Sequence, residues 1–260
     1  MKRFASKCVA LAAAFAAAVP ITARAAEWVT IVVAPPKTYF YEAWAGGDGD
    51  GNSLSVYGGA TSSLSGDIRA DGFRLRTAAG YGIYGYSRSY TVDNHRAWQE
   101  FRGSMTSSDV LLGYQRAFGP WIIKIFAGGT QENHAIVAHG PVGLAVDNPN
   151  SVQGTRFGVK GAIETWLNID NKAFLQTDLS WSQPFEAYGG RVRAGYRINP
   201  AFSSGLEVGV HGNANHDAGR FGSFLRFEWT AGEISASAGL AANSHEITGA
   251  YGSIGMMLRF

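Results

Sequence analysis

The chain has 260 residues, of which 34 are glycine, 13% are aromatic and only 16% are charged. It contains one cysteine and eight prolines. This composition excludes a disulfide-stapled mini-protein, a coiled coil, collagen and a charged disordered chain. The mean hydropathy is −0.06. No apolar run of roughly 18 residues or more follows the N-terminal segment, so we expect no transmembrane helix in the mature chain.

Residues 1–25 have the pattern of a secretory signal peptide. Lys2, Arg3 and Lys7 precede an apolar run over 8–19, and a small-x-small cleavage site ends at Ala25. We therefore predict export through the Sec pathway with cleavage after Ala25.

Cleavage changes both the thiol content and the charge. The single cysteine, Cys8, leaves with the signal peptide. The segment also holds four of the 22 basic residues and none of the 20 acidic residues, so the mature chain has a formal charge of −2. The isoelectric point near 8.6 belongs to the precursor. It gives no reason to expect a nucleic-acid partner.

From Tyr39 onward, apolar residues tend to occupy every second position, which is the period of a β-strand. In the clearest run, Phe73 and Leu75 share one face while Arg74 and Arg76 take the other. The same alternation recurs over 155–167, 190–198, 206–211 and 225–229. The sequence is therefore that of an all-β protein with two-faced strands.

Two architectures produce this pattern: a soluble antiparallel sheet with its charges in water, and a membrane barrel with its charges in the lumen. Three features favour the barrel. Several runs reach the ten or so residues that a tilted strand needs to cross a bilayer. The apolar face carries small residues, and it places aromatic residues near strand ends, as at Tyr81, Trp121, Trp181 and Trp229. The connections also alternate in length.

We predict an antiparallel up-and-down transmembrane β-barrel of about twelve strands, with ten or fourteen as alternatives. The predicted strands lie near 38–47, 53–63, 72–86, 104–116, 121–132, 153–167, 173–182, 189–199, 204–213, 220–230, 233–242 and 249–260. Even-numbered connections, such as 117–120, are expected to be short periplasmic turns, whereas 87–103 and 133–152 are expected to be long outer loops. Residues 26–37 are predicted to be a periplasmic lead-in and 38–260 the barrel, which ends in Phe260, an aromatic terminus found in outer-membrane proteins.

Several blocks resemble a known family. The blocks are Tyr41-Glu42-Ala43-Trp44-Ala45-Gly46-Gly47-Asp48, Asp71-Gly72-Phe73-Arg74-Leu75-Arg76, Gly80-Tyr81-Gly82, Leu112-Gly113-Tyr114-Gln115, Gln153-Gly154-Thr155, Lys160-Gly161, Trp166-Leu167-Asn168, Gly195-Tyr196-Arg197, Asp217-Ala218-Gly219-Arg220 and Gly232-Glu233-Ile234-Ser235. In order and spacing they resemble the cellulose biosynthesis protein BcsS family of Gram-negative bacteria. The resemblance implies an outer-membrane protein associated with cellulose production, with membrane lipid and cellulose or other cellulose-synthesis components as partners. It implies no catalytic residue.

The charged residues on the predicted inward faces form one candidate site. They are Arg74, Arg76, Lys124, Arg156, Lys160, Arg191, Arg193, Arg197 and Arg226, together with Glu42, Asp109, Glu164, Asp178, Glu207 and Glu228. A structural role explains them if neighbouring strands present opposite charges that pair. A functional role is a polar lumen with a positive bias, suited to an anionic or hydrated polar solute.

Aromatic residues on the same faces form a second candidate site. Trp44, Trp166, Tyr84 and Tyr86 provide ring faces on which a sugar could stack, and Phe126 and Phe174 also point inward. The alternative is that these rings fill the lumen of a small barrel.

Other chemistry is less well supported. The stretch 46–52 has the alternating acids of a calcium loop, but Ser53 and Gly59 stand where that motif needs glycine and glutamate, so a hairpin turn explains it better. No GxSxG or HExxH motif is present. We predict a non-catalytic protein without metal or cofactor, acting in cellulose secretion or surface organisation. The alternatives are a general pore for small polar solutes and an outer-membrane lipid or glycan hydrolase.

Overall fold

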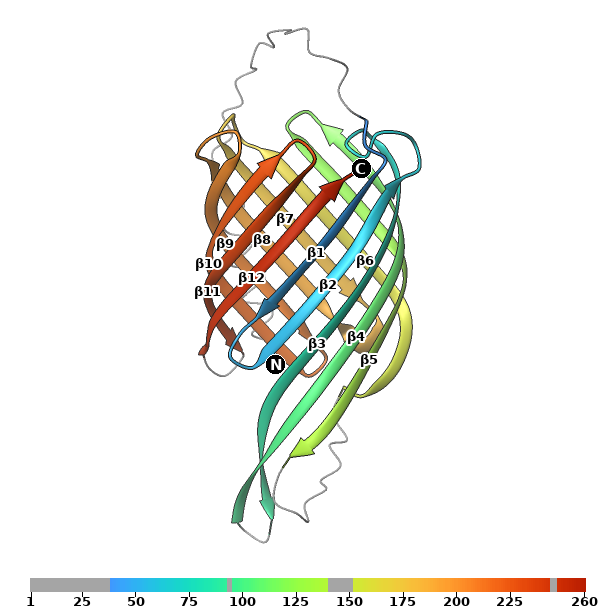
Figure 1. Ribbon diagram of the computed structural model, residues 1–260. Coiled ribbons are helices and arrows are strands. Elements are labelled where there is room, and N and C mark those ends of the chain that lie inside the picture. Colours follow the sequence, from blue (N-terminus) through green and yellow to red (C-terminus); the bar gives the residue numbers. More distant parts are fainter. Residues whose placement is uncertain (1–37, 93–94, 140–151, 244–246) are drawn as a thin grey trace, which may run out of the picture.

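A computed structural model describes residues 38–92, 95–139, 152–243 and 247–260. Nearly all of these residues lie in twelve β-strands (Figure 1). The strands are β1 (Tyr41–Gly49), β2 (Ser53–Ser63), β3 (Gly72–Val92), β4 (His95–Phe118), β5 (Trp121–His139), β6 (Gly154–Asn168), β7 (Ala173–Ser182), β8 (Tyr188–Arg197), β9 (Phe202–Asn213), β10 (His216–Trp229), β11 (Gly232–Asn243) and β12 (Ile247–Arg259). One 3-10 turn, η1 (Pro184–Glu186), lies between β7 and β8. No helix within the described residues is long and apolar enough to span a membrane.

The twelve strands form one closed barrel in which every strand pairs antiparallel with its neighbours in sequence. Closure is made by β1 and β12, where Glu42 lies opposite Arg259. A closed sheet has no free edge, so its backbone groups are satisfied even in a medium without water. The predicted fold class and strand number are confirmed.

Alternation sends the charged residues into the barrel and the apolar residues to its outside. On β3, Arg74 and Arg76 are 1% and 9% exposed, whereas Phe73 and Leu75 are 55% and 40% exposed. The outer wall is apolar along the other strands as well, and it carries the aromatic residues Tyr81, Trp121, Trp181 and Trp229. An apolar exterior around a polar interior is the arrangement of a barrel in the outer membrane, with lipid against the wall.

Both ends of the barrel sequence lie at the same rim, where β1 begins and β12 ends. This rim also carries two-residue turns at 119–120 and 230–231, between β4 and β5 and between β10 and β11. Gly119 adopts a left-handed φ of 59° in the first of them, a conformation that glycine enters without cost. Short turns mark the periplasmic side of such barrels, so we call this rim the periplasmic end and the other the extracellular end.

The prediction of a long loop over 87–103 is wrong. β3 continues to Val92 and β4 begins at His95, so nearly the whole stretch is a paired hairpin. The extracellular parts of β3, β4 and β5 project beyond the other strands, at the bottom of Figure 1. Outside the membrane neither face needs to be apolar, and the alternation that indicated strands elsewhere is lost there.

The predicted loop over 133–152 is shorter than expected for a related reason. β5 continues to His139, and Asn133 and His134 are paired with β6. Residues 140–151 lie outside the described residues, as do the signal peptide and the lead-in at 1–37. The cleavage site and the lead-in therefore stay predictions.

The periplasmic connection 64–71, between β2 and β3, is longer than the other turns at its end and is bound to the barrel. Ile68 is 3% exposed, and its N–H donates to the carbonyl of Tyr39 at 2.7 Å. The guanidinium of Arg74 donates to the carbonyls of Ile68 and Ala70. A turn fixed by side chains of the barrel interior is structural, not a passive linker.

Candidate functional site in the barrel lumen

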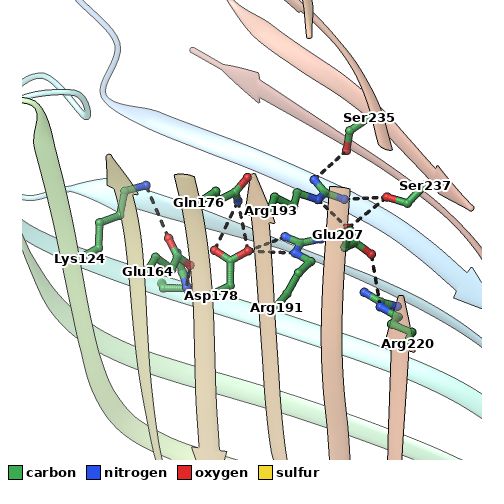
Figure 2. A network of polar contacts seen from close by, with 11 residues as sticks. Lys124, Glu164, Gln176, Asp178, Arg191, Arg193, Glu207, Arg220, Ser235 and Ser237 are labelled. Atoms are coloured by element: carbon green, nitrogen blue, oxygen red, sulfur yellow. Dashed lines mark hydrogen bonds and ion pairs between the residues drawn. The ribbon is translucent and has the colours of Figure 1, made fainter. Parts of the chain in front are cut away.

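A row of charged side chains runs along the inner wall from β5 to β10 (Figure 2). Each comes from a strand position whose neighbours in sequence face the outside, so the two-residue period gathers them in the lumen. Figure 2 shows acidic and basic groups of this row joined by ion pairs and hydrogen bonds. The predicted lumen charges thus lie together, and most of them pair with one another.

Glu207 on β9 is the centre of one cluster. Its side chain is fully buried and accepts a hydrogen bond from Arg193 Nε at 2.6 Å. Arg220 Nε lies 3.4 Å away, and the hydroxyls of Ser237 and Tyr251 donate at 3.1 and 3.2 Å. A buried carboxylate is tolerated when its charge is balanced and its lone pairs are filled, as they are here.

Glu164 on β6 is the centre of a second cluster that crosses the lumen. Arg76 of β3 lies 2.5 Å from one carboxylate oxygen, and Lys124 of β5 lies 3.7 Å from the other. Lys124 also reaches Glu42 of β1 at 3.5 Å. Because β1 and β5 are four strands apart, this contact spans the interior instead of following the wall.

Further ion pairs lie beside these clusters. Arg191 and Asp178, on neighbouring strands, approach to 2.7 Å. Lys160 reaches Asp109, two strands away, at 2.5 Å. Arg226 pairs with Glu228 at 2.6 Å. These contacts fit the structural interpretation of the charges, in which opposite signs neutralise each other inside the barrel.

Within the described residues, three of the predicted lumen arginines form no ion pair within 4 Å of an acidic side chain. Arg74 bonds the carbonyls of the 64–71 connection, as described above. Arg197 donates to the side-chain oxygen of Asn168 at 2.6 Å. Arg156 lies over the ring of Phe185 in η1, 4.6 Å from its centroid. Carbonyl dipoles stabilise the charge of Arg74, the Asn168 side chain that of Arg197, and the face of the Phe185 ring that of Arg156.

The predicted aromatic residues are spread over three regions. Trp166 lies in a packed stack, 4.4 Å from the ring of Phe174 and parallel to it within 16°. The guanidinium of Arg226 lies 4.4 Å from the Trp166 ring. Trp44, on β1, lies 6.2 Å from Tyr57 and is half-buried. No contact joins Trp44 to Trp166 among the described residues.

Tyr84 and Tyr86 lie near the extracellular end of β3. Their rings stack at 6.3 Å, and Tyr86 stacks in turn on Phe101 of β4 at 5.0 Å. The hydroxyl of Tyr84 is 3.2 Å from Nδ1 of His134. The pair thus belongs to an aromatic cluster where the projecting strands leave the barrel.

Some lumen residues could not be assigned from the sequence. Leu111, Phe224 and Tyr251 are buried inside the barrel, and Tyr251 binds the Glu207 carboxylate. Tyr57 and Ser237 also face the lumen. Counting in twos from Arg226 on β10 and from Glu233 on β11 would have placed Phe224 and Ser237 in the lumen. Tyr57 could not be found in this way, because β2 contains no charged residue.

A small cavity of about 20 Å³ lies at the extracellular end of the lumen, beside the β1–β2 hairpin. It is lined by Asp48, Gly49, Asp50, Ser53, His211, Ala218, Arg220, Ala241 and Tyr251. The hairpin itself is a tight turn, in which Asp50 accepts hydrogen bonds from the N–H groups of Asn52 and Ser53 at 2.7 and 2.8 Å. Within the described residues no group of three or more His, Cys, Asp or Glu side chains is placed to hold a metal ion.

The lumen offers little that resembles a hydrolytic site within the described residues. Ser182 donates its hydroxyl proton to Glu132 at 2.5 Å, and His134 contacts Tyr84. A nucleophile activated by histidine needs the serine and the imidazole within hydrogen-bond reach, and no such pair is found in this part of the chain. Ser244 and His245 lie outside the described residues.

Comparison with solved structures finds barrels of similar extent and very low sequence identity. The KdgM porin has 9% identity and a TM-score of 0.47, over 84% of this chain and 99% of that one. The transport unit of the autotransporter AIDA-I from Escherichia coli has 12% identity and a TM-score of 0.48, over 89% and 93%. The COG4313 outer membrane channel from Pseudomonas putida F1 has 10% identity and a TM-score of 0.47, over 90% and 100%.

No curated protein matches the chain. The family model for cellulose biosynthesis protein BcsS matches residues 43–260, which is nearly all of the barrel. This agrees with the resemblance seen in the ordered sequence blocks. The chain belongs to the cellulose biosynthesis protein BcsS family.

Proposed function

We propose that this outer-membrane barrel serves cellulose production without catalysis and without conducting solutes, by retaining or organising the polymer at the cell surface. The family membership and the closed apolar-walled barrel support the link to cellulose and to the outer membrane. The observation that carries the non-conducting role is the set of contacts across the lumen. Lys124 to Glu42 and Arg76 to Glu164 join walls that an open pore would keep apart.

Packing of rings against these charges supports the same role. The guanidinium of Arg76 lies 3.8 Å from the ring centroid of Phe126, which is 1% exposed. Phe174 and Phe224 are equally buried and lie 6.2 Å apart. Small barrels are often filled by their own side chains. Passage of a solute through this lumen would require both the ion pairs and the rings to move.

Planar-bilayer recording tests the non-conducting role. The purified barrel is expected to be silent, whereas the double variant Arg76→Ser, Phe126→Ala is expected to give steady channels because it removes a cross-lumen contact and a filling ring. Arg116→Ser is the matched control, since Arg116 is an exposed residue at the periplasmic end that pairs with Asp71 at 3.8 Å. Steady channels from the unmodified protein would overturn the proposal.

A pore for small polar solutes is the second candidate. It is favoured by Glu164, Asp178 and Arg191, whose side chains are 27–28% exposed inside the barrel and so contact a water-accessible space. The same recording separates the two functions, because a pore conducts without any substitution.

We further propose that the polymer contact lies at Trp44 and at the Tyr84–Tyr86 pair, with Trp166 serving the packing of the lumen. Trp166 already contacts Phe174 and Arg226, and its indole N–H donates to Asn168 at 3.1 Å. In cells that make cellulose, Trp44→Ala is expected to lower the cellulose that stays cell-associated. Trp166→Ala is expected to lower the stability of the barrel, because it removes a packed ring from the lumen. Unchanged cellulose retention in Trp44→Ala would refute the contact at Trp44.

A further inference from the structure

The connection between β7 and β8 crosses the extracellular opening of the barrel. Phe185 of η1 is only 3% exposed, although it belongs to a surface connection. Its ring lies 4.8 Å from that of His134 on β5, and its carbonyl accepts the N–H of Ala214, between β9 and β10, at 2.9 Å. Because β5 and β9 are four strands apart, a residue that contacts both lies over the opening instead of beside the wall.

Ring contacts hold this connection in place. The guanidinium of Arg156 on β6 lies 4.6 Å from the centroid of the Phe185 ring. Pro184 packs on the same strand, where a Cβ at Gly158 would come within 2.7 Å of the proline ring. Within the described residues no ion pair involves 183–187. The position of the connection therefore depends mainly on the burial of Phe185 and Pro184.

The backbone of the same connection is strained. Phe185 and Glu186 have φ values of 54° and 52°, and among the described residues they are the only two non-glycine residues with a positive φ. The Cβ of an L-residue crowds the backbone in this conformation, which is therefore unfavourable. The side chain of Glu186 is exposed and forms no ion pair in this part of the chain, so it does not offset the cost. Burial of the Phe185 ring has to offset the strain at both residues.

We propose that residues 183–187 are a movable lid, with Phe185 as its wedge, that closes the lumen against the cell surface. A strained segment fixed by a buried ring has a closed state that is only modestly favoured, so small changes shift it toward the open state. Opening would uncover His134 and the Tyr84 hydroxyl, which lies 3.2 Å from its Nδ1. The lid goes beyond the proposed function, because it concerns access from the cell surface and not the filling of the lumen.

Thiol labelling beneath the lid measures how often it opens. Thr130 on β5 is 6% exposed and lies opposite Gly158, on which Pro184 packs. The single cysteine of the chain lies in the predicted signal peptide, so Thr130→Cys would carry the only thiol of the mature protein. The purified variant is treated in detergent with a small neutral methanethiosulfonate. The reaction rate follows the open fraction when the lid closes faster than the thiol reacts.

Loss of the wedge is expected to open the lid. In the Thr130→Cys background, Phe185→Ala is expected to react at least about tenfold faster, because it removes the buried ring that keeps the lid closed. Phe157→Ala is the matched control, since it removes the same side chain from the outer wall of β6, where Phe157 is 76% exposed. This control is expected to leave the rate unchanged. The heat-dependent mobility shift of folded barrels on gels shows that each variant is assembled.

Relief of the strain is expected to have the opposite effect. Glu186→Gly leaves the wedge in place and removes the strain at one residue, so the thiol is expected to react roughly fivefold more slowly. Glu186→Ala loses the same carboxylate but keeps the unfavourable φ, and it is expected to react like the Thr130→Cys parent.

The two variants at Glu186 decide the question even if Phe185→Ala fails to assemble, because this side chain is exposed. Equal rates in Glu186→Gly and Glu186→Ala would overturn the lid, as would an unchanged rate in assembled Phe185→Ala. Neither result depends on conductance or on cellulose retention, so the lid and the proposed function fail separately.

Discussion

Glu207 illustrates at the scale of one residue how a lumen filled with charge is stabilised. A carboxylate with no exposed surface is destabilising unless cations and hydrogen-bond donors surround it. Arg193 and Arg220 provide the cations, and Ser237 and Tyr251 provide two hydroxyls. Removing the acid would leave two guanidinium groups without their counter-charge.

We expect Glu207→Gln to lower the free energy of unfolding by about 3 kcal/mol, the usual cost of breaking a buried ion pair. The measurement is urea unfolding in detergent, followed by the heat-dependent mobility shift of folded barrels on gels. Asp71→Asn removes an exposed pair with Arg116 and is expected to cost less than about 1 kcal/mol. Equal losses in the two variants would contradict the central place of Glu207.

Asp67, in the periplasmic connection, gives a prediction about pH. The hydrogen bond from Arg69 lowers the pKa of the Asp67 carboxyl from 3.8 to about 2. The ionised, paired form therefore stabilises the connection at pH above about 4, and this contribution is lost as the pH falls through 2. NMR titration of the labelled aspartates is expected to show Asp67 protonating near pH 2. In Arg69→Ala its pKa is expected to rise toward 3.8, and no rise would refute the assigned cause.

At the scale of elements, β3 and β4 are longer than the membrane requires. Strands of 21 and 24 residues extend for about 70–80 Å at roughly 3.3 Å per residue. The apolar band of an outer-membrane barrel is only about 25 Å tall, so even strongly tilted strands extend well past it. The hairpin is therefore a projection from the cell surface and not part of the membrane anchor.

We expect the barrel to fold without this projection. Replacing 87–100 by Asn-Gly, the sequence favoured in two-residue hairpin turns, keeps Tyr86 opposite Phe101 and leaves every strand of the closed barrel in place. The heat-dependent mobility shift and the unfolding midpoint are expected to stay within error of the full-length protein. Failure of the shortened chain to assemble would show that the hairpin is needed for folding.

The elements that sequence predicts well are those in contact with lipid. Alternation of apolar and polar residues predicts which side chains of β3, β6 and β8 face lipid and which face the lumen, because the lipid-facing side of each strand must be apolar. The same rule fails for 87–103, where both faces of the strands lie outside the membrane. It also fails for 64–71, whose place is set by Arg74 and Tyr39 across the barrel and not by its own pattern.

The candidate site shows the same limit. Parity alone assigns Arg76, Glu164 and Lys124 to the lumen, but it does not say which of them meet. Lys124 and Glu164 are directly opposite each other on β5 and β6. The contact of Arg76 with Glu164 instead joins strands that are not neighbours, so it depends on the tilt and stagger of the closed barrel. Likewise, the sequence gives no reason to distinguish Trp44 from Trp166. Only the structure shows that Trp166 is stacked on Phe174, whereas Trp44 is not stacked on another ring.

At the scale of the whole molecule, the division between lipid and lumen is tested by two adjacent residues of β4. Leu112 is 54% exposed on the outer wall, while Leu111 is 2% exposed inside. We expect Leu112→Arg to reduce the stability of the barrel in lipid by about 2–4 kcal/mol, the cost of a cation in the apolar belt. Refolding into vesicles measures it, with Leu112→Phe as a control expected to be near neutral. If Leu112→Arg left the stability of the barrel in lipid unchanged, this face of β4 would be in contact with water and not with lipid.

Because the ion pair between Arg193 and Glu207 is enclosed, dissolved salt has little access to it. Screening weakens charges that face water over about 10 Å at 0.1 M, but Glu207, Arg193 and Arg76 are buried within the protein wall. The outer wall has lipid against it and carries few charges that ions could screen. The stability that these enclosed pairs give to the barrel is therefore expected to change little as the ionic strength rises.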